Sequence, residues 1–244
     1  MLPQKSFMTK DCLLYESDFD VTTCVKLQRI MELMQDIATT HADKLGCGWD
    51  DMDKHGLFWI LSKVKIEFYK PVTRHNRRFT LYTWPQPSNR LFIERRFSAV
   101  DGSGEELFSA STIWMILNRD NRVFASQQSI GEMYRCDFDT APCTCSATFA
   151  RIRRDESYTL AYQRQIRRTD LDINRHVNNT NYINYALDVL DENERVTAAE
   201  IVYHKELTLG DVISVYVKRE GNKVYVTGER DVTCFTVKLT VADN

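Results

Sequence analysis

The sequence contains little glycine and proline, with 9 glycines and 5 prolines in 244 residues. This scarcity excludes a collagen-like, low-complexity or disordered chain, and the 43% of apolar residues is sufficient for a globular core. A chain of this length corresponds to one large domain or two small ones.

Long apolar runs and a dominant charge are also missing. No stretch of about 18 apolar residues occurs, so we expect no membrane-spanning helix and no membrane partner. Residues 1–21 lack the features of a signal or transit peptide, which favours a cytoplasmic location. Because 32 Lys and Arg oppose 34 Asp and Glu, no overall positive field would attract nucleic acid.

The seven cysteines are odd in number and lack the spacing of a disulfide framework, so we expect reduced thiols. The only close group is Cys136, Cys143 and Cys145. It lacks the paired C-x2-C knuckles and the nearby histidine of a structural zinc site. We therefore expect neither a bound metal nor a cofactor.

The first half of the chain predicts one long helix and an antiparallel meander. Apolar residues recur with helical period over residues 24–45, and Gly46 provides a natural end for that helix. Runs typical of strands follow at residues 58–69, 78–84, 91–100 and 108–118.

The second half repeats this order. A helical stripe from Tyr182 to Leu190 precedes strand-like runs, and two short strings match between the halves. Asp18-Phe-Asp-Val corresponds to Asp170-Leu-Asp-Ile, and IEFYKPV from Ile66 aligns with IVYHKEL from Ile201. Agreement of element order and of both strings favours a tandem duplication. The later runs are residues 199–207, 212–218, 223–229 and 233–241.

The duplication predicts an α+β fold with three parts. We expect an N-terminal module at residues 1–137, a linker at 138–156 and a C-terminal module at 157–244. Each module would be a long helix packed on an antiparallel sheet, and two such modules can pair edge to edge in one continuous sheet. This arrangement is the tandem, or double, hot-dog fold.

The most unusual polar pattern of the second half begins within the string Asp170-Leu-Asp-Ile and continues beyond it. Asp172, Asn174 and His176 fall at i, i+2 and i+4, and on an extended strand all three side chains would share one face. The structural alternative is that these residues only form a turn or a strand end. The first half has Asp20, Thr22 and Cys24 at the corresponding positions, so the fold does not require the Asn and the His. Their presence favours a functional role.

Asn178 and Asn179 follow this pattern and offer side-chain caps for a helix that begins near Thr180. The free N–H groups of that helix would face the same place. A carboxylate, an amide, an imidazole and a helix N-terminus are the components needed to move a proton and stabilise an oxyanion.

The string DLDINRHVNNTNYINYALDVL, from Asp170 to Leu190, resembles the signature of the acyl-acyl carrier protein (acyl-ACP) thioesterases. The resemblance implies a double hot-dog enzyme that releases a fatty acid from acyl carrier protein, with catalytic residues in the C-terminal module. It assigns Asp172, Asn174 and His176 to the site.

A second motif of the family matches Tyr203-His-Lys-Glu-Leu. It assigns Glu206 to the site, whereas the family's cysteine is Leu207 here. Leucine cannot act as a nucleophile, so this excludes a Cys-His-Asn mechanism at the position. We expect hydrolysis by a water that Glu206 activates, with Asp172 sharing or assisting that role.

Two further groups are candidate substrate-binding residues. Arg167 and Arg168 belong to an arginine-rich segment that is either a solvated face or a docking surface for the acidic carrier protein. Trp49, Phe58 and Trp59 are either core residues or part of an acyl tunnel, and we expect the N-terminal module to set the chain length.

Two alternatives stay open. One is a hot-dog hydrolase that acts on acyl-coenzyme A, and the other is a module that binds acyl thioesters without turnover. The sequence also leaves open the chain length and saturation of the acyl group and the association of two chains in a homodimer.

Overall fold

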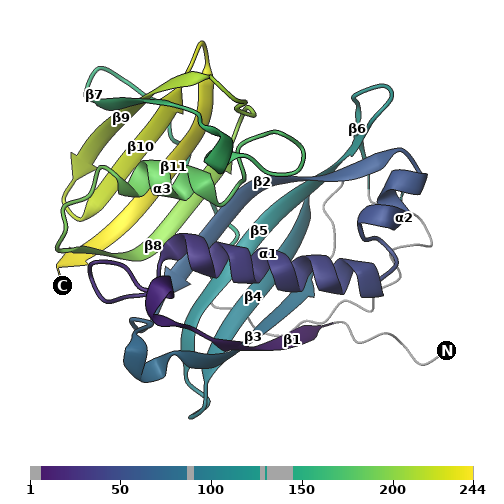
Figure 1. The fold of residues 1–244 in the computed structure, drawn as a ribbon, viewed down its shortest axis with the longest axis horizontal. Coiled ribbons are helices and arrows are strands. Elements are labelled where there is room, and N and C mark those ends of the chain that lie inside the picture. Colours follow the sequence, from purple (N-terminus) through teal and green to yellow (C-terminus); the bar gives the residue numbers. More distant parts are fainter. Residues whose placement is uncertain (1–6, 87–90, 127–129, 131–144, 244) are drawn as a thin grey trace.

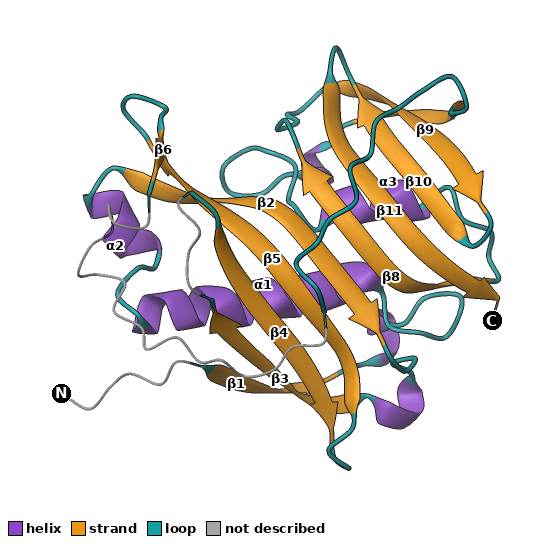
Figure 2. Ribbon diagram, turned by 180° about the vertical axis from the view of Figure 1, so that it is seen from behind, coloured by secondary structure: helices purple, strands orange, loops and turns teal. Residues whose placement is uncertain are grey.

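The computed structural model describes residues 7–86, 91–126, 130 and 145–243. One long antiparallel sheet carries two helices on one face, and Figures 1 and 2 show it from both sides. The first half of the chain forms β1 (Met8–Leu13), α1 (Leu27–Lys44), α2 (Trp49–Lys54), β2 (Leu57–Phe68), β3 (Arg78–Pro85), β4 (Ile93–Asp101), β5 (Glu106–Asn118) and β6 (Phe124–Ala125). The second half forms β7 (Thr159–Gln165), α3 (Asn181–Leu187), β8 (Glu194–Tyr203), β9 (Val212–Glu220), β10 (Lys223–Glu229) and β11 (Thr233–Asp243).

The sheet order is β1-β3-β4-β5-β2-β8-β11-β10-β9-β7, with β6 paired to β5. The two halves therefore meet through β2 and β8, which confirms the predicted edge-to-edge joint. In its register Lys65 lies opposite Glu200, with Val64 opposite Ile201 and Ile66 opposite Ala199. Both strands follow the helix of their own half, so the joint has the two-fold symmetry expected of a duplication.

The predicted meander is wrong for the first strand after each helix. Strand β2 lies between β5 and β8 instead of beside β3, and β8 lies between β2 and β11. Residues 69–77 between β2 and β3 are too many for a tight hairpin and allow the chain to cross to the far edge. The short links from β3 to β4 and from β4 to β5 keep those strands adjacent.

Helix α1 confirms the long amphipathic helix predicted at residues 24–45. It lies across the sheet (Figure 1). Its buried side belongs to the same apolar core as α3 and the strands of both halves. The buried side chains of α1 are Leu27, Ile30, Met31, Leu33, Met34, Ile37, Ala38 and His41.

The expectation of a long helix in the second half is wrong, because α3 has seven residues where α1 has 18. Helix α3 ends at Leu187, and Asp188, Asp191 and Glu192 follow immediately. Negative charges at a helix C-terminus oppose the helix dipole, so this acidic segment ends the helix early.

The described part of the linker crosses the sheet on the face opposite the helices (Figure 2). Lys65 Nζ donates to Thr148 O at 3.3 Å, and Ala150 N donates to Glu200 Oε2 at 2.7 Å. Residues 145–158 contain no helix or strand. Residues 138–144 lie outside the described residues, so the domain limits stay a prediction.

The described cysteines are all buried, and within the described residues none of them forms a disulfide bond. Cys136 and Cys143 lie outside the described residues. No helix in the described ranges is long and apolar enough to cross a membrane.

Candidate active site

The segment that carries Asp172, Asn174 and His176 is a tight turn, which corrects the predicted extended strand. Asp172 N donates to His176 O at 2.8 Å, and Arg175 has a positive φ of 65°. The Asp172 carboxylate accepts from Asn174 N at 2.8 Å and His176 N at 3.3 Å. A short acidic side chain that bonds to the backbone two residues later stabilises a turn.

This turn separates the three predicted side chains. Asp172 is occupied by the backbone of its own turn, and the Asn174 side chain is exposed at the tip. No hydrogen bond joins the Asn174 side chain to His176 or Glu206, all of which lie in the described part of the chain.

His176 and Glu206 are brought together from separate segments. His176 pairs with Thr208 through a β-bridge, which places the imidazole beside the loop that follows β8. His176 Nε2 lies 3.5 Å from Glu206 Oε2, and the two side chains are 38% and 53% exposed. A histidine and a carboxylate at this separation, open to solvent, can bind and activate a water molecule.

Two tyrosines hold the parts of this site in place. Tyr203 Oη donates to Asn179 O at 3.0 Å, and Leu207 N donates to Tyr182 Oη at 3.2 Å. Burial raises the pKa of the Tyr182 hydroxyl, which therefore stays protonated. The rings pack edge to face with centroids 5.4 Å apart, so they couple the start of α3 to the Glu206 loop. In the sequence Tyr182 is recognisable only as the first residue of the helical stripe, because this hydrogen bond joins distant segments.

Leu207, at the position of the family's cysteine, is fully buried in the core. Its carbonyl accepts from Val177 N at 2.8 Å. The side chain at this position therefore has a packing role, and its backbone fixes the turn.

Asn178 contributes to the entry of α3 in a different way from the predicted cap. Its Oδ1 accepts from the N–H and the hydroxyl of Thr180 at 3.0 Å each, one residue before α3 begins. Thr180 itself is the N-cap residue. The expected helix start near Thr180 is confirmed.

A narrow cavity of about 20 Å³ begins at the start of α3 and extends under α1. A water molecule needs roughly 10–15 Å³ of such space, so an alkyl chain enters only if side chains move. Met31 and Met34 form part of the wall, and methionine side chains adapt readily. The lining residues are Met31, Met34, Gln35, Ala38, Leu61, Val64, Phe97, Thr112, Trp114, Asn179 and Thr180.

The three predicted aromatic residues lie at different distances from this cavity. Trp59 packs edge to face against Trp114, with centroids 6.5 Å apart, and therefore lies directly behind the wall. Phe58 alternates to the other face of β2, where the Arg122 guanidinium lies 6.0 Å from its ring. Trp49 begins α2 and is 53% exposed.

Arg167 and Arg168 are exposed on a single 3₁₀ turn, Arg168–Asp170, which leads into the site turn. Arg175 is exposed in the turn itself. Arg164 has a structural role, because it binds Asp170 at 2.7 Å and stacks 4.6 Å from the Tyr185 ring centroid. The predicted positive surface is therefore smaller than the arginine-rich segment, but it lies beside His176.

The first half contains the same turn. Asp20 N donates to Cys24 O at 2.8 Å, and Thr22 N donates to Asp20 Oδ1 at 2.9 Å. Thr23 has a φ of 62°, like Arg175 in the other half. This agreement of individual hydrogen bonds supports the predicted duplication.

The two turns also contact equivalent segments, which follow β2 and β8. Val25 N donates to Val72 O at 2.8 Å, as Val177 N does to Leu207 O. By this alignment Cys24 replaces His176 and Pro71 replaces Glu206. The first half keeps the turn and lacks both groups of the pair.

Two helix-on-sheet repeats that share one antiparallel sheet define the double hot-dog class. The family model described as the acyl-ACP thioesterase N-terminal domain matches residues 4–129, and the model of the C-terminal domain matches residues 153–238. The chain belongs to the acyl-ACP thioesterase family.

Several known proteins are similar to this chain. Oleoyl-acyl carrier protein thioesterase 1, chloroplastic, of Arabidopsis thaliana is 25% identical over 239 residues, covering 84% of this chain and 64% of that protein. The chain thus spans less than two thirds of that relative. Because the relative is named as chloroplastic, the expected cytoplasmic location stays a prediction.

Solved structures support the fold. An acyl-ACP thioesterase from Bacteroides thetaiotaomicron superposes with a TM-score of 0.86 at 22% identity, covering 97% of this chain and 98% of the other. The 12:0-ACP thioesterase from Umbellularia californica gives a TM-score of 0.84 at 17% identity, covering 99% of each chain.

Proposed function

We propose that the protein hydrolyses fatty acyl-ACP thioesters to a free fatty acid and the carrier thiol. The observation that carries the proposal is the pair of His176 and Glu206, whose side chains lie 3.5 Å apart. Asn179, three residues after His176, lines the cavity under α1. The acyl chain would occupy that cavity, with its thioester carbonyl at the start of α3.

In this mechanism Glu206 takes a proton from a water molecule, which attacks the thioester carbonyl. His176 and the first N–H groups of α3 stabilise the oxyanion. When the intermediate collapses, the carbon–sulfur bond breaks and the carrier thiolate takes up a proton. Glu206 is favoured over Asp172 as the base because the Asp172 carboxylate already accepts two backbone hydrogen bonds. Asn174 would act only after the tip of the turn closes on substrate.

A covalent acyl-enzyme is disfavoured by the cysteines that the structure describes. Leu207 cannot react, and burial raises the pKa of the Cys12, Cys24 and Cys234 thiols. Such thiols are poor nucleophiles near neutral pH.

The surface beside the site would receive the carrier protein. Arg167, Arg168 and Arg175 are exposed there and would attract an acidic partner. The N-terminal module would set the chain length, because α1, β2, β4 and β5 supply most of the cavity wall. Trp59 supports that wall through Trp114.

The test uses a panel of acyl-ACP and acyl-coenzyme A substrates, with thiol release and the released acid measured. Glu206→Gln should lower turnover by about 100-fold or more while the melting temperature changes little, because general-base catalysis contributes about 10²- to 10⁴-fold. Glu156→Gln, at an exposed linker position, is the matched control. Preferred hydrolysis of acyl-coenzyme A, or binding of acyl-ACP without thiol release, would contradict the proposal.

A further inference from the structure

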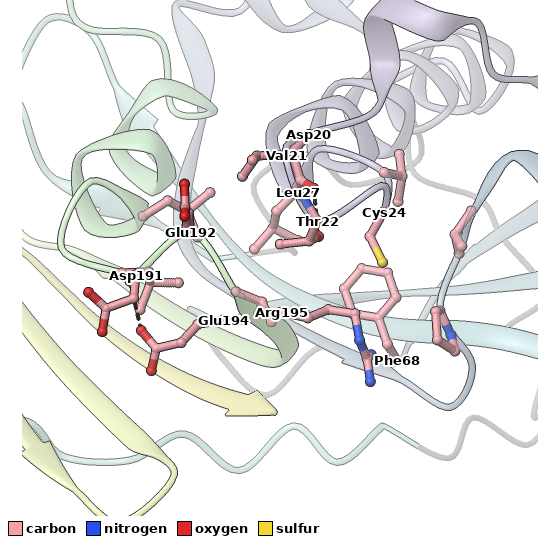
Figure 3. Close-up of a pocket in the computed structure, with 16 residues that line it drawn as sticks. Asp20, Val21, Thr22, Cys24, Leu27, Phe68, Asp191, Glu192, Glu194 and Arg195 are labelled. Atoms are coloured by element: carbon pink, nitrogen blue, oxygen red, sulfur yellow. Dashed lines mark hydrogen bonds between the residues drawn. The ribbon is translucent and has the colours of Figure 1, made fainter. Parts of the chain in front are cut away.

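A second cavity lies at the first-half counterpart of the candidate active site. Its volume is about 210 Å³, about ten times that of the cavity under α1. Figure 3 shows it between the Asp20 turn, the start of α1 and the segment that connects α3 to β8. Helix α3 ends at Leu187, whereas its counterpart α1 continues for several more turns. Leu187 and Leu190, at and after this early end, form part of the cavity wall.

The walls of this cavity are mostly apolar. A preformed apolar cavity of 150 Å³ is large enough for a six-carbon ring, so 210 Å³ accepts roughly eight carbon atoms. The apolar lining residues are Val21, Val25, Leu27, Phe68, Val72, Leu187, Leu190 and Val196.

Arg195 is the one cation among the lining residues. In the described part of the chain its guanidinium makes no ion pair, and its side chain is only partly exposed. The adjacent Glu194 is held by Arg219, with Nη1–Oε1 at 2.6 Å and Nη2–Oε2 at 2.9 Å. Asp20 Oδ1 is bound by Thr22. Figure 3 shows Asp191 and Glu194 together, on the side away from the Arg195 guanidinium.

Cys24, which also lines the cavity, does not provide a negative charge for Arg195. Burial raises the pKa of the Cys24 thiol despite the opposing effect of Arg195, so the thiol stays protonated near neutral pH. A partly buried guanidinium that faces apolar walls can bind a carboxylate with a charge-assisted hydrogen bond.

We propose that this cavity is a second ligand site, which binds the free carboxylate of an alkyl acid of about eight carbons on Arg195. The alkyl chain packs against Leu27, Phe68 and Leu190. Coenzyme A and a carrier protein are disfavoured because exposed Asp191 and Glu192 repel polyanions at the rim. The site has no hydrolytic role, since Cys24 and Pro71 replace the catalytic pair. The product of the proposed reaction belongs to the ligand class, so a role in product feedback rests on the proposed function, whereas the binding itself does not.

Calorimetric titration with octanoate tests the site. Arg195→Gln should weaken binding at least tenfold, and Arg195→Lys should retain part of it. Arg175→Gln removes one positive charge from the corresponding turn of the other half and should leave binding unchanged. Val196→Phe fills the cavity and keeps Arg195, so it should also weaken binding. Its melting temperature is measured to show that the variant is folded.

Octanol, acetate and a catalytic variant complete the test. Octanol lacks the charge and acetate lacks the chain, so both should bind at least tenfold more weakly than octanoate. His176→Ala should bind octanoate as the unchanged protein does, which separates this site from the proposed catalytic one. Octanoate binding that is unchanged in both Arg195→Gln and Val196→Phe, or octanol binding as tight as that of octanoate, would overturn the proposal.

Discussion

The turns at Asp20 and Asp172 have the same backbone and different side chains. Each aspartate accepts from the N–H two residues later, and in each turn the residue with positive φ lies two positions before the valine that donates to an equivalent segment. Only the second turn carries a histidine, and only the loop beside it supplies a glutamate, Glu206. The comparison separates what builds the turn, which is the aspartate, from the groups that we propose for the chemistry, which are His176 and Glu206.

The largest expected difference concerns His176 and its counterpart. His176→Ala should lower acyl-ACP hydrolysis by about 10²- to 10⁴-fold, whereas Cys24→Ala should leave it within about twofold. Steady-state thiol release measures both. Equal losses in the two variants would mean that the halves share the catalysis.

Removal of either aspartate should instead have similar effects on stability. Asp20→Ala deletes the hydrogen bonds from the Thr22 N–H and hydroxyl, and Asp172→Ala deletes those from two backbone N–H groups; each change should cost about 1–2 kcal/mol of the free energy of unfolding. Only Asp172→Ala should also lower turnover, by about tenfold, because it releases His176. Urea unfolding and hydrolysis measured on the same preparations give the free energy of unfolding and the turnover. A loss of stability in Asp172→Ala without a loss of turnover would refute the link between the turn and His176.

A smaller effect is expected from the exposed arginines that precede the Asp172 turn. Reversing Arg167 and Arg168 to Glu should lower kcat/KM for acyl-ACP by several-fold at low salt, and the loss should shrink as salt rises. Hydrolysis of a short acyl-pantetheine mimic should stay unchanged. An equal loss on both substrates would show that these arginines do not contact the carrier protein.

The smallest expected effect is that of thiol alkylation. Burial raises the pKa of Cys12 to about 11, and it raises the pKa of Cys24 and Cys234. The reactive thiolate is then a minor form at pH 7 to 8 and becomes abundant only as the pH approaches the raised pKa. Activity after alkylation at pH 7.5 should therefore be nearly complete, and mass spectrometry of an acylated cysteine during turnover would contradict the water mechanism.

The sequence was sufficient for the duplication, the long helix and the shared sheet, because each depends on a repeated apolar pattern. It did not indicate β1 and β7, since both are edge strands with at most one buried side chain each and therefore carry no clear apolar pattern. The place of β2 in the sheet depends on a long connection and on pairing with β8, which no local pattern encodes.

The site was predicted in part for a similar reason. The repeat and the family motif predicted a functional role for His176 and Glu206; the structure places their side chains side by side, and the role itself stays a prediction. The geometry of Asp172 and Asn174 was not predicted, because a spacing of two residues also fits a turn when the aspartate bonds to its own backbone. The supporting roles of Tyr182 and Tyr203 depend on hydrogen bonds between distant segments.

The joint between β2 and β8 determines which copies can pair. Lys65 and Glu200 occupy the same place in the two repeats and face each other at the centre, with Nζ and Oε1 3.9 Å apart. Burial alone would lower the pKa of Lys65, but the hydrogen bond and charge of Glu67 outweigh it, so the pKa is raised and the amine stays charged. If two first halves from separate chains paired in this register, lysine would face lysine, and two second halves would set glutamate against glutamate. Like charges directly opposed across strands are destabilising, so this one pair of opposite charges favours the joining of a first half to a second half over the joining of two like halves.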